Sequence, residues 1–400
     1  MAETGEFARV TGRVEGVPGP LLLCVGGIHG NEPAGLHAQR RVLTGLAEDR
    51  IPVRGTLICL AGNLGALRKR ARYRDADLNR IWSRTRVALV QRDGTAGARQ
   101  VSAGLGAGPV AEELEQKALL DEIRPALEAA AGRLAYFLDL HTSSADGEPF
   151  VCIGDTLRNR AFASNFPAPV ILGLEEQVDG ALLEFLNDLG LVTIGVEGGQ
   201  HEAPHSIDRH EAALWIALAA AGLIEEHPRV AAARALLECA RPEISAFVEI
   251  RYRHAIRPED NFRMQPGFRN FGRVGKSELL AVDVKGEVLA LRAGRVLLPL
   301  YQGLGDDGFF LAREVRPFWL WVSRVLRRLR CGGIVHWLPG VRRDPDNPDA
   351  RLVDARVARW STIEVFHLLG FRRKRSDGKF LRVRRRRHDL RAPQRYWPPA

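Results

Sequence analysis

The 400-residue chain has few cysteines and no apolar run of membrane-spanning length. Its five cysteines are odd in number and include no close pair at metal-ligand spacing, which excludes a cysteine-based metal cluster and argues against a disulfide framework. Cys24, Cys59 and Cys152 lie in apolar runs, so we expect them in the core as reduced thiols. The longest apolar helical stretch, residues 212–224, is too short to cross a bilayer.

Nothing at the beginning of the sequence resembles a secretory signal peptide. Residues 1–6 are polar and acidic, without the basic region and the apolar region of a secretory signal peptide. Together with the cysteine usage, this predicts a cytoplasmic protein.

What the chain does have is length and apolar content. With 46% hydrophobic residues, it can bury a large core, and 400 residues exceed the usual size of one domain, so we expect at least two. Strand-like apolar runs alternate with longer helix-like stretches, which is typical of an α/β fold with a mixed, mostly parallel sheet flanked by helices. Residues 94–108, rich in glycine and alanine, are expected to form a loop. The expected strands cover residues 21–25, 55–60, 134–140 and 191–196, and the expected helices cover residues 112–131 and 208–223.

An imidazole and a carboxylate lie three residues apart just after the first of these runs. Nearby glycines allow a tight turn, and Pro33 suits the first turn of a helix. His29 and Glu32 are therefore expected at the carboxyl end of a strand, where open α/β sheets keep their sites. His141 follows the run at residues 134–140 in the same way. Because a catalytic zinc ion commonly takes two His and one Glu, these three are candidate ligands; the alternative for each is a hydrogen-bonded structural residue.

Residues 72–82 combine arginines and an amide with apolar anchors. Arginine offers a planar fork of donors that matches the geometry of a carboxylate. The segment therefore suits an anion, and a solvated basic loop is the alternative for the segment taken alone.

Taken together, these motifs resemble the succinylglutamate desuccinylase/aspartoacylase family, which is related to the zinc carboxypeptidases. Three segments in the family's order and with similar separations carry the resemblance: residues 27–33, 72–80 and 139–142. The resemblance implies a zinc carboxypeptidase-like α/β fold. It also implies one zinc ion per chain, held by His29, Glu32 and His141.

The resemblance assigns roles to further residues. It implies that Arg72 helps to polarise the scissile carbonyl and that Asn79 and Arg80 bind the carboxylate of the substrate. It also implies a catalytic glutamate at the end of a later strand, which we identify as Glu197 because the run at residues 191–196 is followed by that carboxylate and two glycines. A carboxylate beside zinc can act as a general base; the alternative is a glutamate that caps a loop.

The implied function is hydrolysis of the amide bond of a small N-acyl amino acid by a zinc-activated water. The aspartoacylase branch uses a further arginine, after the third zinc ligand, to read a side-chain carboxylate. Neither Arg158 nor Arg160 matches that motif, so the acyl group and the amino acid stay open. An ester or a carboxypeptidase-like peptide substrate is left open within the same chemistry.

The pattern changes after residues 1–238, the expected catalytic domain. Short strand-like pieces with turn signals predict a small β domain at residues 239–315. In the resembled family such a domain closes over the active-site entrance; a structural cap or an oligomer contact is the alternative here. Residues 316–400 are expected to form a basic, partly helical extension.

Much of the net charge of +10 lies in this extension, in arginine runs at residues 324–330 and 382–387. Apolar residues at helical spacing predict a basic amphipathic helix over residues 318–330. Such a helix either lies on anionic lipid or packs its apolar face on the protein and leaves its arginines solvated. The sequence has no recognisable nucleic-acid reader motif, so the charge does not favour nucleic acid as a partner.

The state of assembly and one alternative function stay open. A homo-oligomer is compatible with the sequence. The alternative to the enzyme is a non-catalytic protein that keeps the deacylase scaffold and binds anionic partners through the basic C-terminal segment.

Overall fold

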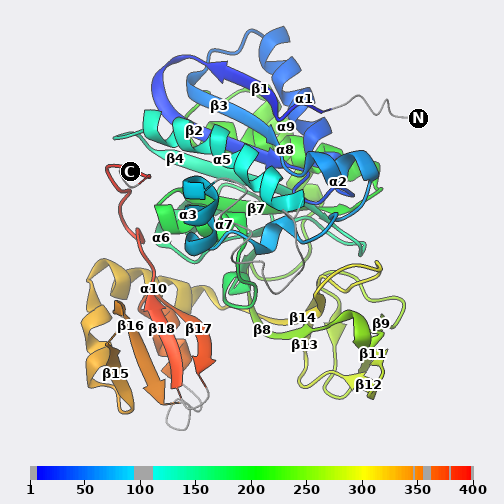
Figure 1. The fold of residues 1–400 in the computed structure, drawn as a ribbon, viewed down its shortest axis with the longest axis vertical. Helices are drawn as coiled ribbons and strands as arrows, with labels where there is room; N and C mark the ends of the chain where they lie inside the picture. Colours follow the sequence, from blue (N-terminus) through cyan, green and yellow to red (C-terminus); the bar gives the residue numbers. More distant parts are fainter. Residues whose placement is uncertain (1–6, 94–110, 346, 355–361, 378–379, 398–400) are drawn as a thin grey trace.

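A computed structural model of the chain (Figure 1) describes residues 7–93, 111–345, 347–354, 362–377 and 380–397. The loop expected at residues 94–108 lies outside these ranges.

An 11-stranded mixed sheet forms the centre of the molecule, in the order β1-β3-β2-β4-β7-β5-β6-β8-β14-β13-β10. Strands β3, β2, β4 and β7 run parallel, whereas β1 and β5 pair antiparallel with their neighbours β3 and β7. This confirms the predicted mixed α/β sheet. The strands are β1 (Val10–Glu15), β2 (Val17–Gly26), β3 (Arg54–Ala61), β4 (Ala135–Ser143), β5 (Phe150–Cys152), β6 (Val170–Leu172), β7 (Val192–Gln200), β8 (Phe247–Ala255), β10 (Arg273–Val274), β13 (Gly294–Leu297) and β14 (Asp307–Glu314).

Helices cover both faces of the sheet (Figure 1). One face carries α1, α6, α8 and α9, and the other carries α3, α5 and α7. The helices of this part of the chain are α1 (Ala34–Glu48), α2 (Leu64–Lys69), α3 (Arg84–Asp93), α5 (Ala111–Ala129), α6 (Leu157–Ala163), α7 (Leu182–Leu189), α8 (Pro204–Ala220) and α9 (Pro228–Cys239), with single 3₁₀ turns η1 (Leu78–Arg80) and η2 (Leu174–Glu176).

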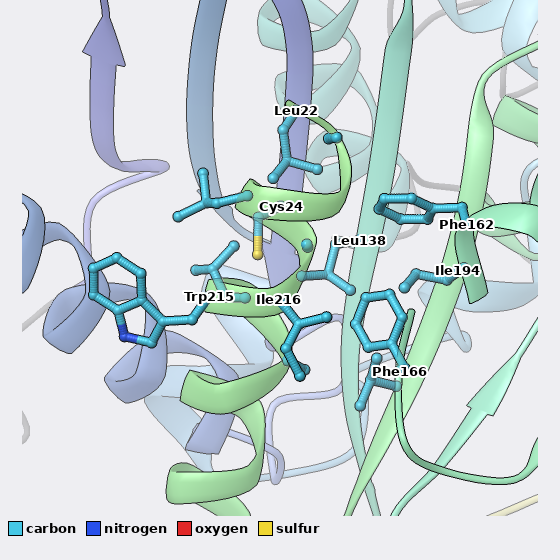
Figure 2. Close-up of a cluster of buried hydrophobic side chains, with 14 of the residues drawn as sticks. Leu22, Cys24, Leu138, Phe162, Phe166, Ile194, Trp215 and Ile216 are labelled. Carbon is cyan, nitrogen blue, oxygen red and sulfur yellow. The ribbon is translucent and has the colours of Figure 1, made fainter. Parts of the chain in front are cut away.

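The central strands are apolar on both sides because side chains alternate between two cores. Leu22 of β2 enters the core beneath α8, whereas Leu23 enters the core beneath α5. Figure 2 shows the first core, where Trp215 and Ile216 of α8 gather with Cys24 of β2. Each fully buried side chain of this size stabilises the fold by about 1.5–3 kcal/mol. Cys24, Cys59 and Cys152 are buried and unpaired, as predicted.

The small β domain is confirmed and is continuous with the main sheet. Strand β8 pairs with β6 of the preceding part of the chain and with β14, so the sheet extends through both. A second, three-stranded sheet has the order β12-β11-β9 and completes this domain. Its members are β9 (Arg263–Met264), β11 (Leu279–Asp283) and β12 (Gly286–Leu289), with the 3₁₀ turn η3 (Pro258–Asp260) before them.

The C-terminal segment contains the predicted helix but is more than a basic tail. After α10 it forms a four-stranded antiparallel sheet in the order β15-β16-β18-β17, with its own apolar core that includes Phe366 and Phe371. The segment expected as a basic, partly helical extension thus also contains strands, and it is a folded α/β unit (Figure 1). Its elements are α10 (Pro317–Arg328), η4 (Cys331–Trp337), β15 (Val341–Asp344), β16 (Asn347–Asp354), α11 (Thr362–Leu368), β17 (Phe371–Asp377) and β18 (Phe380–Arg385).

Buried ion pairs hold this unit against the rest of the chain. Arg327 Nη2 lies 2.8 Å from Asp155 Oδ2, and Arg386 Nη2 lies 2.7 Å from Glu175 Oε1. The arginine run at residues 382–387 is therefore partly interior. In the part of the chain that the structure describes, no helix is both long enough and apolar enough to traverse a bilayer.

Candidate active site

The turn between β2 and α1 positions the first two candidate ligands, His29 and Glu32. Gly27 has a φ of +69°, which favours glycine, and a Cβ on Gly30 would lie 2.1 Å from the carbonyl carbon of Ala66. The chain therefore bends tightly here, and α1 begins directly after Pro33. This geometry holds His29 and Glu32 at the carboxyl end of β2.

The order of the strands brings the other candidates to the same edge. The chain continues from β2 to β3 on one side, while β4 lies on the other side, so the crevice between β2 and β4 is a topological switch point. His141 near the end of β4 is in register with Glu197 of β7.

His29, Glu32 and His141 form one cluster. Their potential ligand atoms all lie within 4.8 Å of one another. Glu32 Oε1 is 2.8 Å from His29 Nδ1, and Glu32 Oε2 is 3.2 Å from His141 Nδ1. The backbone N–H of Thr142 also donates to Glu32 Oε2, over 3.0 Å. The structure thus brings the three sequence-predicted ligands together, with Glu32 between the two imidazoles.

Two further carboxylates, which are not among the predicted site residues, orient the histidines. Asp77 Oδ1 lies 3.2 Å from His29 Nε2, and Asp139 Oδ2 lies 3.0 Å from His141 Nε2. Asp139 precedes His141 by two residues on β4, so both side chains lie on the same face of the strand. This spacing is a pattern in the sequence from which the contact could have been predicted. Asp77 has no comparable signal, because it approaches His29 from the turn before η1.

The charges in this cluster stabilise one another. Burial alone would raise the pKa of Glu32, but His29 and His141 hold it well below its usual value. Burial would likewise lower the pKa of His141, whereas Asp139 and Glu32 raise it well above the ordinary range. Burial would raise the pKa of Asp77, and His29 and Arg72 hold it well below normal. Glu32 and Asp77 are therefore ionised at neutral pH.

This donor set fits a zinc ion. Two imidazoles and one carboxylate are the protein ligands of many catalytic zinc sites, which leave a further position for water or substrate. Carboxylates that hydrogen-bond ligand histidines, as Asp77 and Asp139 do here, are the usual outer partners of such sites.

Glu197 lies beside the cluster, and its carboxyl group has spare hydrogen-bonding capacity. Among the described residues its Oε2 has no hydrogen-bond partner. Burial raises the pKa of Glu197 to about 8, and the nearby Glu32 carboxylate acts in the same direction. A carboxyl group with a pKa near neutrality can both accept and return a proton.

Arg72 supplies positive charge at the same place. Its Nη2 lies 3.0 Å from Asp77 Oδ2, and its Nη1 lies 3.7 Å from Glu32 Oε1. The guanidinium is fixed at the edge of the cluster and lines the cavity beside it.

Asn79 and Arg80 lie in η1 and also line this cavity. The side-chain oxygen of Asn79 accepts a hydrogen bond from Leu182 N over 2.9 Å, which fixes the amide. Arg80 Nη2 lies 3.0 Å from Asp307 Oδ2 in β14. Both side chains are therefore held by contacts with later parts of the chain.

The cavity encloses about 180 Å³ and has the small β domain as one wall. Residues 298–300 and 305–307 of that domain line it. His201 and Gln302, for which no role was predicted, also line it. His201 Nε2 lies 3.2 Å from Gln302 Oε1, and His201 Nδ1 lies 2.8 Å from the hydroxyl oxygen of Thr142. Burial lowers the pKa of His201, so the ring is neutral at neutral pH.

Arg158 and Arg160 do not line the cavity. Arg160 Nη2 donates to Asp155 Oδ2 over 2.8 Å, and Arg158 Nη1 donates to the carbonyl of Gly190 over 2.7 Å. Neither guanidinium stands where a second substrate carboxylate could reach it.

Sequence comparison places this chain among known proteins. A profile of the succinylglutamate desuccinylase/aspartoacylase catalytic domain matches residues 18–217. Succinylglutamate desuccinylase of Pseudomonas putida is 35% identical over 122 residues, which are 30% of each chain. The match thus spans about a third of the length of that relative.

Solved structures share the fold at low sequence identity. A product-bound ectoine utilization protein from Ruegeria pomeroyi superposes with a TM-score of 0.52 at 22% identity, covering 76% of this chain and 87% of that one. A succinylglutamate desuccinylase/aspartoacylase from Rhodobacter sphaeroides gives a TM-score of 0.52 at 20% identity, covering 76% and 88%.

Proposed function

The chain belongs to the succinylglutamate desuccinylase/aspartoacylase family of deacylases, and we propose that it is a zinc-dependent hydrolase that cleaves the amide bond of an N-acyl amino acid. The observation that carries this proposal is the His29–Glu32–His141 cluster beside Glu197, whose buried Oε2 has no hydrogen-bond partner among the described residues.

His29, Glu32 and His141 would hold one zinc ion per chain. Zinc, when bound, lowers the pKa of a coordinated water to about 7 and polarises a carbonyl oxygen. Asp77 and Asp139 keep the two imidazole rings oriented toward that position.

Glu197 and Arg72 would carry out the proton transfer and the charge stabilisation. Glu197 accepts a proton from the attacking water at Oε2, the oxygen that has no other described partner. The water oxygen bonds to the acyl carbon, the carbon–nitrogen bond breaks, and Glu197 returns the proton to the amine nitrogen. Arg72 donates to the carbonyl oxygen while negative charge develops there.

Asn79 and Arg80 would orient the substrate through one carboxylate. Among the described residues, Arg72 and Arg80 are the arginines that line the cavity. Its remaining walls include Leu174, Leu183 and Phe310. Acidic residues also line these walls, and one of them, Glu184, is paired with Arg372 over 2.8 Å. We infer a substrate with one carboxylate and an otherwise apolar body rather than a dicarboxylate.

A panel of N-acetyl amino acids tests this specificity. We expect kcat/KM for N-acetylleucine or N-acetylmethionine to exceed that for N-acetylaspartate and N-succinylglutamate. A clear preference for either dicarboxylate would contradict the single-carboxylate cavity and leave the hydrolase proposal intact.

Zinc content of the purified full chain tests the metal site. We expect about one zinc per chain in the parent and almost none in His29→Ala. His205→Ala, which changes an exposed histidine outside the cavity, should keep the metal. A parent chain that holds no zinc after reconstitution would refute the mechanism and favour the non-catalytic scaffold.

Substitution of the proposed base separates binding from turnover. Glu197→Gln should keep its zinc and lose about 10²–10⁴-fold in kcat, the usual contribution of a general base. The exposed Glu202→Gln is the matched control and should retain parental kcat. Parental turnover by Glu197→Gln would remove this residue from the mechanism.

A cytoplasmic location stays a prediction from the sequence.

A further inference from the structure

Helix α10 exposes apolar side chains on the face that points away from the protein. Phe318, Trp321 and Leu329 are 60%, 59% and 70% exposed. Their spacing of three and eight residues puts them on one side of the helix, with the partly buried Val325 between them. The chain continues into η4 with two more exposed apolar side chains, Ile334 and Trp337. We call these five exposed residues, together with Arg324 and Arg328, the α10 surface.

The opposite face of the helix is already anchored, so the exposed face is not needed for folding of the helix. Ser323 Oγ donates to the carbonyl of Leu368 over 3.1 Å. Arg327 is buried and donates to the Asp155 carbonyl and carboxylate, each over 2.8 Å. One arginine of the helix thus faces inward, while Arg324 and Arg328 are exposed.

The charge around the α10 surface has a single sign. Residues 316–343 contain seven arginines and no aspartate or glutamate. Within the described chain, the side chains of Arg324, Arg328 and Arg330 form no ion pair. Glu314 and Asp344, which flank this stretch, are paired with Arg295 and Arg382. The surface therefore presents unneutralised positive charge beside exposed aromatic rings.

We propose that the α10 surface binds an anionic phospholipid membrane. Trp and Phe rings insert at the boundary of headgroups and acyl chains, and arginines beside them lie on the polar face toward the headgroups. Each basic residue near an anionic leaflet adds attraction. Because no described helix can traverse a bilayer, the contact is peripheral. The inference goes beyond the proposed hydrolase function and does not depend on it.

Two other occupants fit the surface less well. A second copy of the chain, related by a twofold axis, would bring the same arginines face to face without acidic partners. Single-stranded nucleic acid stacks its bases on aromatic platforms along a basic groove, whereas Leu329 and Ile334 are aliphatic and protrude from the surface.

Vesicle co-sedimentation of the full chain tests the proposal. The probes are phosphatidylcholine vesicles with and without about 30 mol% phosphatidylglycerol, at about 0.1 M salt, where screening of surface charge is moderate. We expect binding to the anionic vesicles and little to pure phosphatidylcholine.

Paired substitutions locate the contact. Leu329→Glu should weaken binding at least about tenfold, because the change opposes insertion. Arg324→Glu with Arg328→Glu should weaken it at least about 30-fold, since each basic residue contributes about 1 kcal/mol at an anionic surface. The matched controls are Leu291→Glu and Arg292→Glu, which change exposed residues of the small β domain and should bind as the parent does. Thermal melting checks that every variant is folded.

Four results would overturn the proposal. They are no binding of the parent to anionic vesicles, parental binding by Leu329→Glu, binding to polyuridylate instead of vesicles, and a dimer that Leu329→Glu dissociates while vesicles are not bound.

Discussion

Asp139 holds the His141 imidazole through the ring nitrogen that does not contact Glu32. Its other oxygen, Oδ1, has no hydrogen-bond partner among the described residues. The carboxylate thus acts on the site through His141, as a positioning residue. Asp139→Asn keeps the shape and removes the negative charge, so we expect zinc binding to weaken by about 10–100-fold, measured by competition with a chelator.

The control for this prediction is another aspartate of the cavity wall. Asp306 lines the cavity, and among the described residues no hydrogen bond or ion pair joins its side chain to the candidate ligands. Asp306→Asn should therefore bind zinc like the parent. Equal zinc affinity in parent and Asp139→Asn would show that the imidazole is oriented without this carboxylate.

Gly30 is required by close packing of two backbones rather than by its own φ angle. A Cβ at this position would lie 2.1 Å from the carbonyl carbon of Ala66. Gly30→Ala must therefore displace the turn that carries His29 and Glu32. We expect a loss of about 1–3 kcal/mol in the free energy of unfolding, measured by denaturant titration, together with reduced zinc content.

Gly303→Ala provides the comparison, because no described atom outside Gly303 and its two chain neighbours lies within 4 Å of the added Cβ. This variant should unfold like the parent. If Gly30→Ala were equally stable and kept full zinc content, the turn would be more deformable than its packing indicates.

The candidate ligands were predictable from the sequence because each follows an apolar run that becomes a strand. His29, Glu32 and His141 meet as soon as β2 and β4 become neighbours in a parallel sheet. Asp77 could not be assigned in this way, since its contact with His29 joins residues 48 positions apart through an irregular turn. Such contacts follow from tertiary packing and leave no local pattern.

At the level of elements, apolar strands were predictable and arginine-rich strands were not. The runs at residues 21–25 and 134–140 correspond to β2 and β4. Strand β18 was not predicted because its arginine run was interpreted as a basic segment that could bind anionic partners. Arg384 lies 3.3 Å from Asp188 and is only 9% exposed, so long-range ion pairs make this strand compatible with the interior.

Helix α11 is joined to η2 and β8 by a histidine between two carboxylates. His367 Nε2 lies 3.0 Å from Glu176 Oε2, and its Nδ1 lies 3.1 Å from Glu249 Oε1. Burial would lower the pKa of His367, but Glu176 and Glu249 raise it to about 9. Burial would raise the pKa of Glu249, whereas His367 and two arginines lower it to about 2.

These shifts define a pH window of stability. The raised pKa of His367 stabilises the fold fully below the unfolded value of about 6.5 and ceases to do so as the pH rises through about 9. The lowered pKa of Glu249 stabilises the fold above about 4.5 and ceases to do so as the pH falls through about 2. Both contributions are complete between about pH 4.5 and 6.5.

His367→Gln should remove the alkaline part of this dependence. We expect the parent to lose on the order of 3 kcal/mol of unfolding free energy between about pH 6.5 and 9 that the variant does not lose. Urea titration across this range measures the difference, with the exposed His205→Gln as control. Parallel pH profiles for parent and His367→Gln would mean that the histidine is not charged in the folded protein.

At the scale of the whole molecule, the C-terminal end of the described chain packs on the main sheet. After the C-terminal sheet, Tyr396 and Trp397 enter the core on the α5 face of the main sheet. The hydroxyl of Tyr396 accepts a hydrogen bond from Ala135 N over 3.0 Å and donates to the carbonyl of Arg133 over 2.7 Å. The C-terminal unit is therefore tied to β4, the strand that carries His141, by its last described residues as well as by Arg327 and Arg386.

Two tryptophans allow a direct test of this contact between the C-terminal unit and the main sheet. Trp397 is 8% exposed and packs edge-on against Phe185, with ring centroids 6.0 Å apart, whereas Trp337 is 88% exposed. Trp397→Ala should lower the unfolding free energy by about 3–5 kcal/mol, because it empties a buried site. Trp337→Ala should change it by no more than about 0.5 kcal/mol. Because β4 carries His141, we also expect Trp397→Ala to lose zinc at a lower denaturant concentration than the parent. Equal effects of the two substitutions would show that the C-terminal residues do not stabilise the catalytic sheet.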